Sequence, residues 1–163
     1  VATAIGNLGD LTFRAVEILK SADLVLAEDT RHTRILFQKY EISRPLQSCH
    51  AQTSPEKIFE ILKKLPNESS VALVSDAGTP GISDPGFRAV RAALDLDFNI
   101  SPIPGASALS ALVSVAGVPA DKFTFLGFLP HKKGRQTILK NLKTAEISTI
   151  FYESVSATFG RTF

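Results

Sequence analysis

The sequence is short of several residue types, and each shortage excludes a class of protein. Cys49 is the only cysteine, so an internal disulfide and a multi-cysteine zinc site are both excluded. No apolar run approaches the roughly 20 residues that a membrane-spanning helix needs, and the N-terminus lacks the basic-then-apolar pattern of a secretory signal. These features favour a protein of the reducing cytoplasm with no membrane partner.

Positive and negative charges are nearly balanced, with 18 basic and 16 acidic residues and a net charge of +2. The overall charge therefore does not by itself indicate a nucleic-acid partner. A hydrophobic content of 44% with 21% charged residues predicts a globular domain that can bury a core without cross-links. Methionine is absent, and Val1 leads almost directly into a glycine loop, so we expect the chain to begin partway into the protein.

Short β-rich apolar segments alternate with helical patterns, which is typical of βαβ units and predicts an α/β fold with a parallel sheet. The expected strands comprise residues 1–5, 24–27, 46–50, 70–75, 99–103, 123–129 and 148–152. The expected helices comprise residues 12–20, 30–40, 54–65, 86–94, 105–116 and 136–142. Phe13 and Ile35 are expected on the buried faces of their helices.

Turn residues cluster at residues 117–121 and predict a domain boundary. We expect an N-terminal α/β domain at residues 1–118, followed at 119–163 by the beginning of a C-terminal α/β domain. One strand, one helix and one strand cannot close a domain alone, so this second domain is expected to be truncated.

Four polar, glycine-rich loops follow expected strands, at residues 6–10, 28–31, 76–86 and 102–107. In an open parallel sheet the carboxyl ends of the strands form the ligand-binding edge, because loops and helix N-termini present free N–H groups there. The shared position of the four loops is a better signal than any one of them. It predicts a single binding edge.

The first two loops are acidic. Residues 6–10 lack the three-glycine spacing of a dinucleotide fingerprint, and Asp10 at the helix start would repel a phosphate. The alternative interpretation of residues 6–10 is a plain strand-to-helix turn capped by Asp10. The pair Glu28 and Asp29, with Arg31 nearby, could orient a hydroxyl or shift a pKa, or could equally form a capping cluster with a surface ion pair. A zinc site built from these acids with His32 and His50 has no motif spacing behind it.

The third and fourth loops have unusual backbone chemistry. Residues 76–86 hold three glycines and two prolines, which fix a path that can bring main-chain groups against the adenine and methionyl parts of a cofactor. An ordered structural turn is the alternative, although ten irregular residues without a function are uncommon in a compact domain. Ser107 and the free amides of the fourth loop could hydrogen-bond a polar ligand.

A basic segment lies outside these loops, at residues 130–135. It gathers Lys132, Lys133 and Arg135 with a histidine, and phosphate is the natural partner of such a group. A solvated surface loop is the alternative interpretation. Cys49 is expected to fill the core, since no Cys-His-Asp signature surrounds it.

Taken together, these motifs resemble one family in order and spacing. The matching segments are residues 1–10, 27–31, 75–86, 102–108, 127–130 and 150–154. They are similar to the bacterial 2′-O-methyltransferases of small-subunit ribosomal RNA, within the tetrapyrrole (corrin/porphyrin) methylase superfamily. The resemblance implies two α/β domains with S-adenosylmethionine between them, a homodimer, and methyl transfer to a cytidine ribose hydroxyl.

The resemblance also implies roles for individual residues. The implied cofactor contacts are Asp76, Ala77, Gly78, Thr79, Pro80, Ile82, Ser107, Ala108 and Phe128. The implied contacts to ribosomal RNA are Asn7, Arg31, Lys132, Lys133 and Arg135. Asp29, Glu28 and Asp10 are candidates for a catalytic base or a charge-stabilising group, and no metal is expected.

Two other functions stay open at this point. A methyltransferase of the same superfamily could act on a carboxylate-rich tetrapyrrole, which the basic segment would also attract. The chain could instead be an inactive, truncated binding domain. Comparing methyl transfer to RNA with transfer to a porphyrinoid distinguishes an RNA methyltransferase from a tetrapyrrole methyltransferase. Measuring cofactor affinity distinguishes either enzyme from an inactive binding domain.

Overall fold

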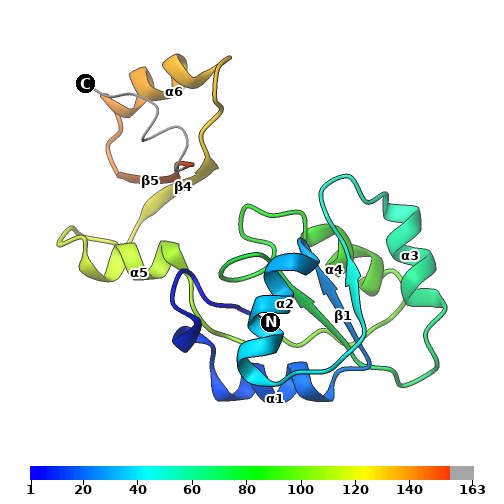
Figure 1. Cartoon of the computed structure of the whole chain (residues 1–163). Helices are drawn as coiled ribbons and strands as arrows, with labels where there is room; N and C mark the ends of the chain where they lie inside the picture. Colours follow the sequence, from blue (N-terminus) through cyan, green and yellow to red (C-terminus); the bar gives the residue numbers. More distant parts are fainter. Residues whose placement is uncertain (155–163) are drawn as a thin grey trace. The chain divides into compact units, whose positions relative to one another are not determined.

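The computed structural model describes residues 1–154, and the chain divides into two compact units, Val1–Ala108 and Leu109–Phe163 (Figure 1). The expected domain boundary at residues 118 and 119 stays a prediction. Among residues 1–154, the helices are all too short or too polar to cross a membrane.

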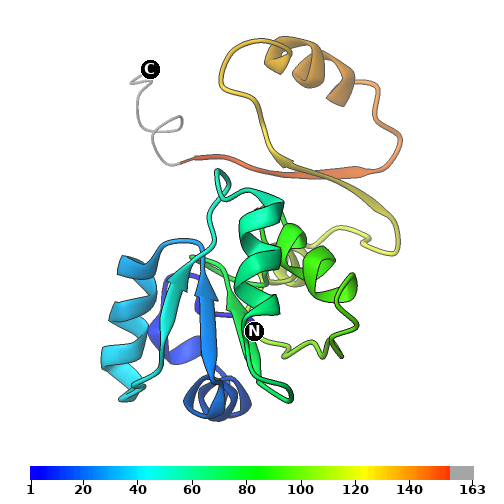
Figure 2. The ribbon, with the colours of Figure 1, turned by 90° about the vertical axis from the view of Figure 1, so that its right-hand side faces the viewer.

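The first unit is built on a three-stranded parallel sheet of order β2-β1-β3, which confirms the predicted α/β class (Figures 1 and 2). Val25 at the centre pairs with Leu46 on one side and Ala72 on the other. The strands are β1 (Leu24–Ala27), β2 (Leu46–Ser48) and β3 (Val71–Val74). The helices are η1 (Leu8–Asp10), α1 (Phe13–Ser21), α2 (Thr30–Tyr40), α3 (Pro55–Lys63) and α4 (Phe87–Leu94).

A helical layer covers each face of this sheet. Successive side chains of a strand point to opposite faces, so β1 is apolar throughout and contributes to both layers. One core cluster joins the sheet to α1 and α2 and contains Ala15, Leu19, Val25, Ala27, Leu36, Phe37 and Val74. The other joins it to α3 and α4 and contains Leu24, Leu26, Cys49, Ile58, Leu62, Ala89 and Ala92. The prediction of a buried Cys49 is thereby confirmed.

The strands predicted at residues 1–5 and 99–103 are wrong. The N-terminal segment lies beside β3 and makes only one antiparallel bridge, between Thr3 and Gly78. The N-terminal segment donates scattered hydrogen bonds, from the Val1 ammonium to the Leu73 carbonyl (2.7 Å) and from the Thr3 N–H to the Gly78 carbonyl (2.9 Å). The Ala2 N–H donates to the Ile103 carbonyl (3.1 Å), which joins the two segments. Isolated bonds of this kind do not make the ladder that defines a strand.

Local capping residues begin the helices close to where the sequence predicts. The side chains of Thr12 and Ser54 each accept a hydrogen bond from the amide three residues on, as N-cap residues do. The predicted burial of Phe13 and Ile35 is wrong, because these side chains are 92% and 57% exposed. Helix α1 is anchored instead through Ala15 and Leu19, which are fully buried.

The second unit contains a pair of parallel strands with a helix between them in sequence. Its elements are α5 (Ala108–Val115), β4 (Phe123–Phe128), α6 (Arg135–Leu142) and β5 (Ser148–Tyr152). Helix α5 begins three residues later than predicted, so residues 105–107 form an extended entry to it rather than its first turn.

Candidate functional site

The loops after β1 and β3 meet at the carboxyl edge of the sheet. The Asp29 N–H donates a hydrogen bond to Oδ1 of Asp76 (2.9 Å). The other carboxylate oxygen of Asp76 lies 3.4 Å from Nδ1 of His32, in the first turn of α2. Asp76 therefore joins the two loops, as expected of neighbouring parallel strands whose ends share one edge.

Asp29 is engaged with the start of α2. Its carboxylate accepts from the Arg31 backbone N–H (2.8 Å) and binds the Arg31 guanidinium through Nε (3.0 Å) and Nη2 (2.6 Å). These hydrogen bonds hold the pKa of Asp29 well below its usual range. The sequence left open whether this loop forms a capping cluster, and Asp29 does cap the helix.

Glu28, the neighbouring residue, has the opposite electrostatic setting. Partial burial raises the pKa of its carboxyl, and the negative charges of Asp76, Asp84 and Asp29 raise it further. A carboxyl whose pKa is raised toward neutrality is a better proton acceptor than one held by a guanidinium. Of the two carboxylates after β1, Glu28 is therefore the one suited to acid–base chemistry.

Asp84 fixes the shape of the long loop at residues 76–86. Its carboxylate accepts from the N–H of Gly81 (2.7 Å) and the N–H of Gly86 (2.6 Å). Gly78 has a φ of 78°, and a Cβ there would lie 3.3 Å from the Ile5 side chain, so glycine is needed at this position. No residue pattern indicated that Asp84 would hold the loop in this way.

The third and fourth loops are joined by the Thr79 hydroxyl, which donates to the Ala106 carbonyl (3.3 Å). The predicted cofactor residues of the first unit therefore lie on two connected segments at one edge. Asp76, Ala77 and Ile82 are exposed there, whereas Gly78 is buried.

The side chains at this edge fit a cationic ligand that lacks phosphate. The carboxylates of Asp76, Asp84 and Asp29 lie close enough to Glu28 to raise its pKa. The Arg31 guanidinium is already paired with Asp29. Such a donor set would repel a phosphate and attract a sulfonium or an ammonium group. The residues present therefore suit S-adenosylmethionine and do not suit a nucleoside phosphate.

The first loop contributes to the same edge. Asn7 uses its side-chain oxygen to accept from the Gly9 N–H (2.9 Å) and caps η1, and Asp10 is exposed at the end of that turn. A small cavity of about 60 Å³ lies beside the loop. It is lined by Thr3, Ala4, Leu8, His32, Thr33, Leu36, Ser75 and Asp76.

Sequence reasoning missed Thr3 and gave His32 only a metal-binding role. Thr3 is buried and donates its hydroxyl to the Ser75 carbonyl (3.2 Å). His32 stands in the first turn after the acidic loop, a spacing that could have indicated its place at this edge. Among residues 1–154 no group of three or more His, Cys, Asp or Glu is arranged to hold a metal ion.

The second unit carries the predicted basic segment at the carboxyl end of β4. Lys132 and Lys133 are exposed. Arg135 is half-buried and donates to the carboxylate of Glu153 at the end of β5 (2.5 Å). Phe128 is exposed, and its ring centroid lies 5.2 Å from that of Tyr152.

These features define an α/β protein with a ligand-binding edge at the carboxyl ends of parallel strands. Residues 1–160 match the sequence profile of the family described as Tetrapyrrole (Corrin/Porphyrin) Methylases. The chain belongs to this family, which confirms the recognition made from the loop motifs.

Several curated relatives are similar over 94% of the chain. Ribosomal RNA small subunit methyltransferase I of Thermotoga maritima is 47% identical over 154 residues, which span 69% of that protein. The proteins of the same name from Xylella fastidiosa and Escherichia coli O157:H7 are 50% and 45% identical, with 57% and 54% of their lengths matched. The chain thus spans between about half and about two thirds of the length of these relatives.

Proposed function

We propose that this chain is the cofactor-binding part of an S-adenosylmethionine-dependent methyltransferase that acts on a cytidine ribose 2′-hydroxyl of small-subunit ribosomal RNA, working in the cytoplasm as a homodimer. The observation that carries the cofactor assignment is the acidic edge of the first unit, in a chain that belongs to the methylase family. The names of the relatives favour ribosomal RNA over a tetrapyrrole as the substrate class.

The cofactor supplies, when bound, a methyl group made electrophilic by its sulfonium. The long loop would bind it through Asp76, Ala77, Gly78, Thr79, Pro80 and Ile82, and the fourth loop through Ser107 and Ala108. Phe128 stays a predicted cofactor contact, as the family resemblance implies. Asp84 supports this assignment, since its two hydrogen bonds preorganise the loop before any ligand binds.

Glu28 is the proposed proton acceptor. Its carboxylate would accept the proton of the ribose hydroxyl, while the bound cofactor would supply the methyl group. The raised pKa of Glu28 brings its basicity closer to that needed near neutral pH. Asp29 then positions Arg31 toward the RNA rather than accepting a proton itself, and Asp10 stays a predicted contributor.

Phosphate contacts are assigned to Lys132 and Lys133, whose ammonium groups are free to move in solvent. Arg135 was predicted to share that role, and its pairing with Glu153 favours a supporting part in it. Asn7 is proposed to contact the RNA from the first loop, where its remaining amide group is exposed.

The direct test is transfer of a labelled methyl group from the cofactor to small-subunit RNA, compared with a porphyrinoid acceptor. Label in the RNA at a cytidine ribose is the expected result. Label in the porphyrinoid alone would overturn the substrate class. Cofactor binding without any methyl transfer would overturn the assignment of methyltransferase activity to this chain.

A further inference from the structure

Helix α2 presents a basic surface to solvent along its whole length. Its residues include Arg31, His32, Arg34 and Lys39 and no aspartate or glutamate. These four side chains are all exposed. The helix therefore gathers three fixed positive charges in a chain whose net charge is only +2.

The helical spacing places the charges on the side that faces away from the sheet. Helix α2 covers one face of the sheet through Thr33, Leu36 and Phe37, which are buried (Figure 1). The exposed residues follow one another in steps of one, three or four along the opposite side and are Arg31, Arg34, Ile35, Gln38 and Lys39. This outer face of α2 is about 12 Å long, because an α-helix rises about 1.5 Å per residue.

Two of the three fixed charges are uncompensated. The Arg31 guanidinium binds Asp29, but the side chains of Arg34 and Lys39 make no hydrogen bond or ion pair with the part of the chain that the structure describes. Lys39 lies in the last turn, where a positive charge also stabilises the helix dipole. Arg34 lies in the middle of the helix and has no such role, so it is the stronger indication of an external anion.

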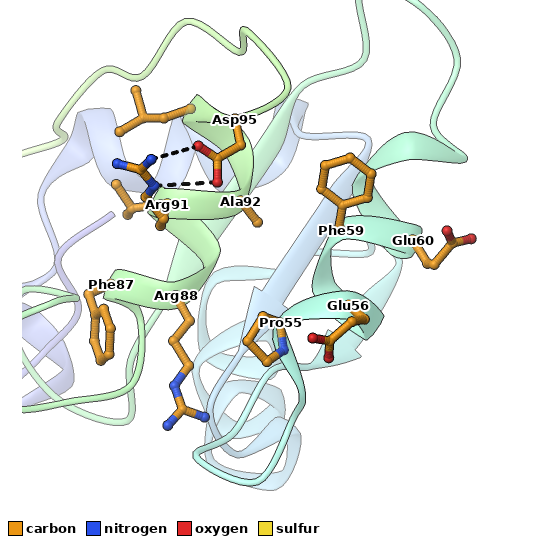
Figure 3. Close-up of a pocket in the computed structure, with 11 residues that line it drawn as sticks. Pro55, Glu56, Phe59, Glu60, Phe87, Arg88, Arg91, Ala92 and Asp95 are labelled. Atoms are coloured by element: carbon orange, nitrogen blue, oxygen red, sulfur yellow. Dashed lines mark hydrogen bonds and ion pairs between the residues drawn. The ribbon is translucent and has the colours of Figure 1, made fainter.

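Helix α4, on the other face of the sheet, provides a contrast. It also has two arginines, but Arg91 pairs with Asp95 (3.1 Å; Figure 3). The Arg88 guanidinium donates a hydrogen bond to the Ala51 carbonyl (2.6 Å). The arginines of α4 therefore have partners within the chain, whereas Arg34 of α2 has none among residues 1–154.

The outer face of α2 begins at the carboxyl edge of the sheet. Arg31 stands in the first turn of the helix, three residues after Glu28, the proposed proton acceptor. A polyanionic strand that lay along α2 would therefore reach the candidate site at one end of the helix. A row of separated cations is complementary to the repeated phosphates of such a strand. Ile35 is 57% exposed between the charges and offers an apolar contact to a sugar or a base.

We propose that the outer face of α2 binds the sugar–phosphate backbone of the substrate RNA, with Arg34 and Lys39 as phosphate contacts beyond Arg31. The inference rests on the proposed function, which takes RNA as the substrate, and it adds a binding surface within the first unit. Phosphate contacts fix the position and orientation of a nucleic acid without reading its sequence. The α2 surface would thus guide the RNA to the site, and other residues would select the nucleotide.

The salt dependence of RNA binding tests this surface. A labelled fragment of small-subunit ribosomal RNA is titrated with the whole chain at a series of salt concentrations, and the affinity is measured by fluorescence anisotropy. Each phosphate contact contributes roughly 0.7 to 0.9 to the slope of log affinity against log salt concentration. The double variant Arg34→Gln with Lys39→Gln should therefore bind more weakly at low salt, with a slope reduced by roughly twice that amount.

A second double variant, Arg91→Gln with Lys57→Gln, is the matched control. It removes the same charge from two exposed helical positions on the other face of the sheet, so it should leave the slope nearly unchanged. Titration with S-adenosylhomocysteine should give the same affinity for both variants and the unchanged chain, because none of the four residues belongs to the cofactor loops.

The outcomes separate this surface from the proposed function. An unchanged chain that binds no RNA would overturn RNA as the substrate, and the α2 surface with it. RNA binding with the same slope in the α2 variant and the unchanged chain would overturn the surface alone. An equal reduction of the slope in the two double variants would also overturn it, because the effect would then come from net charge.

Discussion

At the scale of single residues, two adjacent carboxylates after β1 have opposite environments. Asp29 is held ionised by the Arg31 guanidinium and by the Arg31 backbone N–H. Glu28 is partly buried among other negative charges, which raises its pKa. When the environments of two neighbouring acids push their pKa values apart, they are suited to different roles.

Glu28→Gln should therefore lower kcat for RNA methylation by about 10²- to 10⁴-fold, the usual contribution of a positioned base, while leaving cofactor affinity intact. In the unchanged protein the rate should rise with pH as Glu28 loses its proton, because only the carboxylate can accept one. This acidic limb should vanish in the variant. Glu17→Gln, an exposed acid on α1, is the control, and equal rates for the two variants would remove Glu28 from the mechanism.

Asp29→Asn separates the two roles of Asp29. Asparagine is as good an N-cap as aspartate, so α2 should still form, but the ion pair with Arg31 is lost. We expect a higher KM for RNA with kcat nearly retained, measured by steady-state methyl transfer. A loss of kcat as large as that of Glu28→Gln would instead make Asp29 the proton acceptor.

The pair of Arg135 with Glu153 predicts a pH-dependent stability. The guanidinium lowers the pKa of Glu153 below its usual value, so the pair stabilises the folded state above the unfolded pKa and loses its effect as pH falls through the folded one. Glu153→Gln should lower the Tm at pH 7, and its difference from the unchanged chain should shrink as pH falls below the ordinary pKa of a glutamate, about 4.3. A constant difference at all pH values would contradict this origin.

The sequence predicts only part of this residue-level arrangement. The capping cluster of Asp29 and Arg31 is local, so two neighbouring positions were enough to propose it. The bond from the Asp29 N–H to Asp76 joins residues 47 positions apart and depends on β1 lying beside β3. Strand order is a tertiary property, and it brings Asp76 near Glu28, where its charge adds to the effect of burial in raising the Glu28 pKa.

At the scale of elements, local signals placed most helices and strands well. Thr12 and Ser54 cap helices where the sequence predicts, and β1 and β5 have the predicted bounds. The segments at residues 1–5 and 99–103 have strand-like composition but lack a ladder, because each meets its neighbour through isolated hydrogen bonds. Pairing with a neighbour, rather than composition, decides whether such a segment becomes a strand.

The long loop gives a prediction at this scale. Asp84→Ala removes both acceptors that fold residues 81–86, so the loop must be ordered by the ligand instead. We expect weaker binding of S-adenosylhomocysteine with little change in Tm, since the loop lies outside the core. Asp121→Ala, at an exposed position of the second unit, is the control. Unchanged affinity in Asp84→Ala would show that the clamp has no part in binding.

At the scale of the whole molecule, the central claim is that the first unit already carries a cofactor-binding edge. The family assignment extends over residues 1–160, while the chain spans only part of the length of its relatives. The edge is assembled from four loops that one three-stranded sheet and its neighbouring segments bring together. We therefore expect the four loops together, rather than any single motif, to bind the cofactor.

The most direct measurement is a calorimetric titration of this chain with S-adenosylhomocysteine. We expect saturable binding near one molecule per chain, weakened by Gly78→Val, because a side chain there meets Ile5 and distorts the loop. Gly134→Val has the same left-handed backbone strain, with open space around it, and should leave the affinity unchanged. A well-folded chain that binds no S-adenosylhomocysteine, or binds it equally well with valine at position 78, would contradict the claim.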